Sequence, residues 1–145
     1  MKITIEQISR EQNEEVILRC HEVNDQILQM LQSLKASESG LVGIKGEELH
    51  RLSLEDIFYF EVVENRSFFY CRDNIYESKL KLYEFEEISK GGGFFRASKS
   101  TILNADKIEF VSPSFSGRFA AILRNGEKVV VSRQYVGTLQ KKMGL

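Results

Sequence analysis

The sequence has few of the residues that build disulfide frameworks, metal sites or membrane spans. It contains two cysteines, two histidines and one proline in 145 residues. Cys20 and Cys71 are too few for a disulfide framework and lie in apolar runs, so we expect buried free thiols. No apolar run approaches the roughly 18–20 residues of a membrane span, and the N-terminus lacks the apolar stretch of a signal peptide. These absences predict a cytoplasmic protein with one main core.

Arrangements that would support catalysis are also missing. His21 and His50 have no Cys, His, Asp or Glu neighbours at metal-ligand spacing. Cys20 and His21 are adjacent, and in a strand their side chains point to opposite faces, which argues against a nucleophile–base pair. The carboxylate pairs at 47–48 and 86–87 are interpreted as solvated surface. We therefore predict a non-enzymatic protein with no metal, cofactor or small-molecule substrate.

Charge is divided unevenly along the chain. Residues 94–145 hold nine Lys/Arg and three Asp/Glu, whereas residues 1–93 hold eleven and eighteen, so a net charge of −1 hides a basic C-terminal end. Such asymmetry indicates contact with nucleic acid or another polyanion.

The first 40 residues predict a small β-β-α leader. Residues 2–6 and 15–20 are rich in branched apolar residues, as in short strands. Ile27, Leu28, Leu31 and Leu34 then recur at helical spacing, which predicts a helix over 24–36 with Asn24 or Asp25 as its N-cap. We expect this leader to serve a dimer or regulatory contact. The helix packs either on its own domain, which we favour, or on another copy.

Residues 41–145 predict a second, mainly β domain. Helices are expected at 78–90 and 133–142, the second capped by Ser132. Gly91-Gly92-Gly93 closes the first of these helices, and Phe94-Phe95-Arg96 follows where a phosphate-binding loop would need Gly-Lys-Ser/Thr. Asn125-Gly126 predicts a tight two-residue hairpin. Strands are expected at 41–45, 48–52, 56–63, 67–71, 75–76, 108–112, 118–124 and 127–131.

Two cations in the basic end are the best candidates for contacting a nucleic acid. Lys99 lies between Ser98 and Ser100, whose hydroxyls are good phosphate donors. Arg133 stands at the expected first turn of a helix, where free N–H groups and the helix dipole favour an anion. Structural capping by these serines is the alternative, and DNA contact is favoured over it.

Residues 41–143 contain several motifs in a recognisable order. They are Asp56-Ile57-Phe58-Tyr59-Phe60-Glu61, Phe95-Arg96, Ser98-Lys99-Ser100, Asn104, Ile108, Asn125-Gly126, Ser132-Arg133 and Tyr135. These motifs resemble the LytTR family of DNA-binding domains, which many bacterial response regulators carry at their C-terminus. Residues 1–40 also resemble the leader of stand-alone LytTR regulators, which lack a receiver domain.

The resemblance implies elongated antiparallel sheets whose loops enter successive major grooves of double-stranded DNA. It assigns base contacts to Arg66 or Ser67, Lys99 and Arg133. Loop support or phosphate contact is expected from Arg96, Ser98, Ser100, Asn104, Arg118, Arg124 and Lys128. The resemblance also implies two copies on direct repeats, a homodimer on DNA, and a small multipass membrane protein that restrains the regulator.

Two other functions remain open from the residues alone. A basic face could serve a protein-interaction module that meets an acidic partner. An RNA-binding β domain would stack bases on exposed sheet aromatics, and Phe58, Phe60, Phe68 and Tyr70 alternate in a compatible way.

Overall fold

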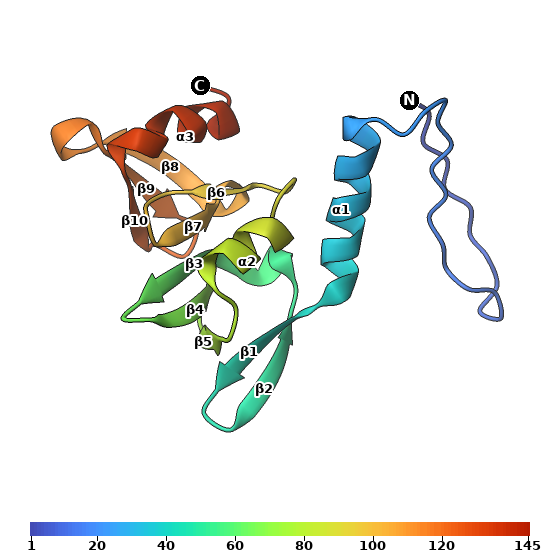
Figure 1. The fold of residues 1–145 in the computed structure, drawn as a ribbon, viewed down its shortest axis with the longest axis horizontal. Coiled ribbons are helices and arrows are strands. Elements are labelled where there is room, and N and C mark those ends of the chain that lie inside the picture. The colour runs from blue at the N-terminus through green and yellow to red at the C-terminus, as the bar shows by residue number, and fades with distance from the viewer.

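The computed structural model describes residues 1–145, except the side chains of residues 32, 33 and 35–39. It contains two antiparallel sheets and three α-helices (Figure 1), so the mainly β prediction is confirmed. The helices are α1 (Asp25–Ser39), α2 (Leu82–Ile88) and α3 (Val136–Met143).

The larger sheet has seven strands in the order β2-β1-β5-β4-β3-β7-β6, and the smaller has three in the order β10-β9-β8. The strands are β1 (Leu41–Lys45), β2 (Glu48–Leu52), β3 (Ile57–Val63), β4 (Arg66–Cys71), β5 (Ile75–Ser78), β6 (Phe94–Arg96), β7 (Thr101–Asn104), β8 (Ile108–Pro113), β9 (Phe119–Leu123) and β10 (Lys128–Val131).

Strand β3 divides the apolar residues between two cores. Its pairing with β4 shifts register between Ile57 and Tyr59, as at a β-bulge. Phe58 and Tyr59 therefore belong to one core, while Ile57 and Phe60 belong to the other. The large sheet is consequently covered on both of its faces.

The first core joins the two sheets and α3. Leu103 from the large sheet is fully buried with Leu123 and Val131 from the small sheet and Leu139 from α3. The second core lies between the large sheet and α2, where Phe85 stacks on Phe60 with ring centroids 4.6 Å apart. Each fully buried side chain of this size contributes about 1.5–3 kcal/mol relative to exposure.

The aromatic residues that an RNA-binding sheet would need are not exposed. Phe58 and Phe60 are buried, and Phe68 and Tyr70 are half-buried. Base stacking requires an accessible ring face. Phe58, Phe60 and Tyr70 pack in or against the two cores instead, so the four rings do not form a stacking platform.

The prediction of a two-residue hairpin at Asn125-Gly126 was wrong. The Gly126 N–H donates to the Leu123 carbonyl and the Leu123 N–H donates to the Glu127 carbonyl. Only Gly126 has positive φ, at 89°, as expected for a three-residue loop that ends in a G1 bulge. The two-residue turn is instead at Glu64 and Asn65, which both have positive φ and connect β3 to β4.

The strands predicted at 2–6 and 15–20 do not form. Residues 1–24 have no regular secondary structure and lie on the far side of α1 from the sheets (Figure 1). Ile3 and Ile5 are each 88% exposed. A hairpin without an apolar face to cover is marginal in water, and no described part of the chain covers these side chains.

Helix α1 starts where the sequence predicted. The Asn24 side chain accepts from the Ile27 N–H at 3.0 Å, which confirms Asn24 as the N-cap. Ile27 is 5% exposed, whereas Leu28, Leu31 and Leu34 are between 37% and 47% exposed. Because α1 stands apart from both sheets in Figure 1, the preferred expectation that this stripe packs on its own domain is not met for the three leucines.

The two thiols differ in their environments. Cys20 is exposed, contrary to the expectation of burial, because the predicted strand 15–20, which would have placed it in a sheet, does not form. Cys71 is half-buried beside the second core, and burial raises its pKa to about 11.

We predict that Cys71 resists thiol reagents in the folded protein. With a pKa near 11, about one Cys71 thiol in a thousand is ionised at pH 8, and only the thiolate reacts. In a Cys20→Ser variant, reaction with Ellman's reagent should be slow in buffer and fast in urea. Equal rates in the two conditions would contradict the burial of Cys71.

Candidate nucleic-acid interface

The loop that carries Lys99 is tightly hydrogen bonded to itself. It joins the antiparallel strands β6 and β7, and the Ala97 and Ser98 N–H groups donate to the Thr101 carbonyl at 2.9 and 3.4 Å. The Ser100 N–H donates to the Ser98 hydroxyl at 3.3 Å. Both serines therefore shape the loop.

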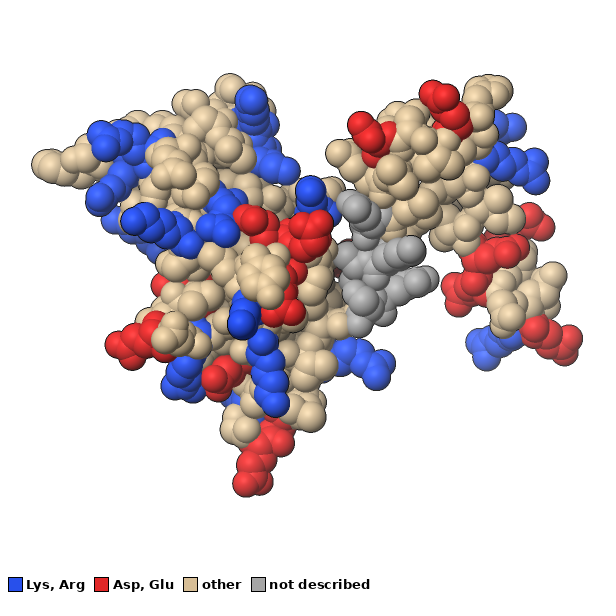
Figure 2. Space-filling view, in the orientation of Figure 1, with Lys and Arg blue, Asp and Glu red and all other residues tan. Residues whose placement is uncertain are grey.

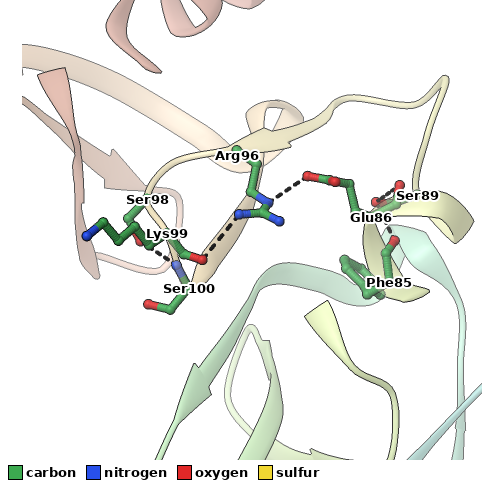
Figure 3. A network of polar contacts seen from close by, with 7 residues as sticks. All are labelled: Phe85, Glu86, Ser89, Arg96, Ser98, Lys99 and Ser100. Carbon is green, nitrogen blue, oxygen red and sulfur yellow. Dashed lines mark hydrogen bonds and ion pairs between the residues drawn. The ribbon is translucent and has the colours of Figure 1, made fainter. Parts of the chain in front are cut away.

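Arg96 attaches this loop to helix α2. Its Nε donates to the Glu86 carboxylate at 2.6 Å, and a terminal guanidinium nitrogen donates to the Lys99 carbonyl at 3.2 Å (Figure 3). Arg96 thus supports the loop. Glu86 is exposed, as predicted for a surface residue, but its ion pair with Arg96 was not predicted, because the partner is ten residues away in sequence and no local spacing indicates the pair.

The Lys99 side chain is left free for a ligand. It is exposed and points away from Arg96 and α2 (Figure 3). Among the described residues, no carboxylate lies within ion-pair distance of its ammonium group.

A backbone hydrogen bond places Arg133 beside this loop. The Ser132 N–H donates to the Ala97 carbonyl at 2.8 Å, which connects the end of β10 to the 97–100 loop. Arg133 then begins a 3-10 turn, Arg133–Tyr135, that precedes α3. The Ser132 side chain makes no capping hydrogen bond, so its predicted capping role was wrong.

Gly117 supports the Arg133 side chain. A Cβ atom at Gly117 would lie 3.0 Å from the Arg133 Cδ, and the φ of Gly117 is +76°. The backbone conformation favours glycine, and a Cβ atom there would make the Arg133 side chain shift by a few tenths of an ångström. Arg133 is exposed, and no described carboxylate pairs with it.

The β3–β4 hairpin lies on the other side of the 97–100 loop. The Val62 N–H donates to the Ser100 carbonyl at 2.9 Å. Arg66, at the start of β4, is exposed but makes two hydrogen bonds to Glu77, at 3.0 and 3.1 Å. This guanidinium holds the pKa of Glu77 below its ordinary value. Ser67 is only 8% exposed, so its predicted contact with bases would require the side chain to become accessible.

Four loops therefore form one continuous surface, which we call the loop ridge. It consists of residues 64–66, 97–100, 115–118 and 132–133. Its cations Arg66, Lys99, Arg118 and Arg133 are all exposed, and Glu64 is its one acidic residue. Figure 2 shows Lys and Arg gathered over the part of the molecule built from the small sheet and α3.

Three other predicted residues lie away from this ridge. Arg124 and Lys128 flank the β9–β10 turn, at the opposite end of the small sheet from Phe119 and Val131, which adjoin the ridge. At about 3.3 Å per residue, the length of β9 separates them from it by roughly 13–17 Å. Asn104 is buried, donates to the Ile57 carbonyl and accepts from the Asp106 N–H, so it supports β7.

Sequence reasoning selected Arg118 but missed the rest of the 115–118 loop. Phe115 is 85% exposed and lies two residues before Gly117, which the Arg133 side chain approaches closely. The run Pro113-Ser114-Phe115-Ser116-Gly117 signals a turn, but no local pattern reveals that this turn meets Arg133.

The described residues contain no group of three or more His, Cys, Asp or Glu that could hold a metal ion. In the same part of the chain, no helix is both long and apolar enough to cross a membrane.

Comparisons with known proteins concern the family and the fold. A family model described as the LytTr DNA-binding domain matches residues 47–144. A sensory transduction protein, LytT, of Enterococcus faecalis is 32% identical over 112 residues, which are 77% of this chain and 46% of that protein. This chain thus spans less than half of that relative.

Other similarities extend over more of the chain or concern the fold alone. An uncharacterized HTH-type transcriptional regulator of Staphylococcus aureus is 23% identical over an alignment that covers 100% of this chain and 99% of that protein. The solved LytTr DNA-binding domain of a Bacillus cereus response regulator superposes with a TM-score of 0.68 at 23% identity, covering 73% of this chain and 97% of that domain.

We predict that Glu86→Gln loosens the 97–100 loop. Losing the charged partner of Arg96 removes a contact worth about 0.5–1 kcal/mol, which corresponds to roughly two- to five-fold faster amide exchange at Ala97 and Ser100. Glu87→Gln is the matched control, because Glu87 has only an exposed pair with Lys90 at 4.0 Å. If both variants exchanged at the wild-type rate, the Glu86–Arg96 contact would have no supporting role.

Proposed function

The chain belongs to the LytTR family of DNA-binding domains and is a DNA-binding transcriptional regulator; we propose that it reads double-stranded DNA by placing the loop ridge in the major groove. The proposal rests on the Ser132–Ala97 hydrogen bond, which holds Lys99 and Arg133 in neighbouring loops. Both cations are exposed at positions where the family resemblance expects base contacts.

The ridge cations have different roles in this proposal. Arg133 and Lys99 donate to guanine O6 and N7, a contact worth about 1–3 kcal/mol of base discrimination. Arg118 contacts phosphate, and such contacts supply most of the affinity, with a salt slope of about −0.9 for each phosphate neutralised. Phe115, beside Arg118, adds apolar contact to the groove wall.

Arg66 contacts DNA in this proposal only when it releases Glu77. Its guanidinium is exposed but bound to Glu77, so contact with DNA requires exchanging a carboxylate for a base or a phosphate. Ser67 is left out of the set because it is buried.

In this proposal the two parts of the chain have different functions. Residues 41–145 bind DNA, and residues 1–40 serve contacts between proteins. Two copies occupy direct repeats in the cytoplasm of a bacterium, where the DNA is, and a small multipass membrane protein restrains the regulator. The resemblance to stand-alone LytTR regulators supports these partners.

Selection of bound duplexes from a random pool tests the readout. Arg133→Ala should reduce preference for the selected site by about 5–150-fold, the equivalent of one lost base contact. Arg118→Ala should weaken all sequences equally and lower the salt slope by about 0.9. Lys128→Ala, at the far end of the small sheet, serves as the control and should change neither. A selection profile that Arg133→Ala leaves intact would show that Arg133 does not read bases.

A second prediction concerns Arg66. Glu77→Gln should free its guanidinium and tighten binding about two- to five-fold at low salt, since both groups are exposed and such pairs are weak. Glu48→Gln makes the same change of net charge on β2, away from the ridge. An equal gain from both variants would mean that only overall charge matters.

A further inference from the structure

The first 24 residues, here called the arm, expose an unusual amount of apolar surface. Ile3, Ile5, Val16 and Ile17 are between 64% and 88% exposed. Exposed apolar side chains in such number are typical of a segment that buries them against a partner. The arm is also acidic, with five glutamates against three Lys/Arg.

A matching apolar groove lies at one end of the large sheet. It has a volume of about 530 Å³, and its lining includes Val42, Ile44, Leu49 and Leu80. Val42 is 56% exposed and Leu49 is 73% exposed. Lys79 also lines the groove, with Lys81 two residues further along the chain, and both are exposed.

The strand beside this groove has a free edge. Strand β2 is the terminal strand of the large sheet and pairs only with β1. A free edge presents unpaired N–H and C=O groups that an extended segment can satisfy by adding a strand. Lys2-Ile3-Thr4-Ile5-Glu6 suits that role, because alternation puts Ile3 and Ile5 on one face.

We propose that the arm of one copy docks on a second copy, with residues 2–6 pairing along β2 and Ile3 and Ile5 covering the groove. A second copy is favoured over the chain's own arm because α1 stands between the arm and the sheets (Figure 1). The glutamates of the arm also complement Lys79, which lines the groove. Because each chain carries both arm and groove, the exchange is reciprocal and closes a two-fold dimer.

This contact leaves the DNA-binding surface accessible. Strand β2 is at one edge of the large sheet, and β6, which leads into the 97–100 loop, is at the other. The dimer therefore presents two loop ridges, and its test is independent of DNA binding.

Sedimentation of the full chain without DNA tests the proposal. The wild type should be a dimer, and Leu49→Glu and the double variant Ile3→Glu, Ile5→Glu should each weaken the dimer at least about tenfold by burying a charge in the contact. Ile75→Glu is the control, because Ile75 is an exposed apolar residue on β5 outside the groove. A monomeric wild type, or a dimer that resists both changes, would overturn the proposal.

Mixing the two monomeric variants gives the sharper result. The Leu49→Glu chain keeps an intact arm and the double variant keeps an intact groove, so the mixture can form one arm–groove contact. Differently tagged chains should therefore co-purify as a heterodimer, which misfolded variants cannot do. Failure of the mixture to associate, with both chains folded by circular dichroism, would overturn the proposal, because the intact arm and the intact groove would then not bind each other.

Discussion

A backbone hydrogen bond from the Ser132 N–H to the Ala97 carbonyl fixes the end of the small sheet against the large sheet. Arg133 directly follows Ser132, and Lys99 is two residues after Ala97. Without this bond, the two loops would be joined only through the core beneath them. With it, two exposed cations from segments more than 30 residues apart share one surface, and the hairpin and the 115–118 loop extend that surface on either side.

The cores explain why this surface is rigid. Ala97 is fully buried in the core between the sheets, as are Val131 and Leu139 on either side of the 132–135 turn. The loop ridge is therefore anchored by packed residues immediately next to its exposed ones. On the opposite face of the large sheet, α2 packs through Phe85 and supplies Glu86 to Arg96. Both layers of the fold thus hold the same loop.

Local patterns were sufficient for much of the fold. Apolar alternation located most strands of residues 41–145, and Asn24 located the start of α1. The leader strands failed because β-branched residues favour a strand only where a neighbouring surface covers one face, and local sequence does not contain that information. The prediction of a two-residue turn at Asn125-Gly126 failed because this dipeptide also fits a three-residue loop. In that loop only the glycine, at the G1 bulge, needs positive φ.

Sequence reasoning identified two cations of the site but not the contacts that hold them in place. Lys99 and Arg133 could be selected because charge, flanking hydroxyls and family resemblance agreed. The Ala97–Ser132 bond, the Glu86 partner and the Gly117 support are long-range contacts with no local pattern, and the burial of Ser67 depends on which face of β4 is covered. Such features follow from tertiary packing.

The central claim is that the loop ridge is the surface that meets DNA. Amide chemical shifts of the full chain, measured as a selected duplex is added, test it most directly. The account predicts that the largest changes fall on residues 64–66, 97–100, 115–118 and 132–135, with little change near β1 and β2. Changes concentrated on β1, β2 or the 124–128 turn would contradict it.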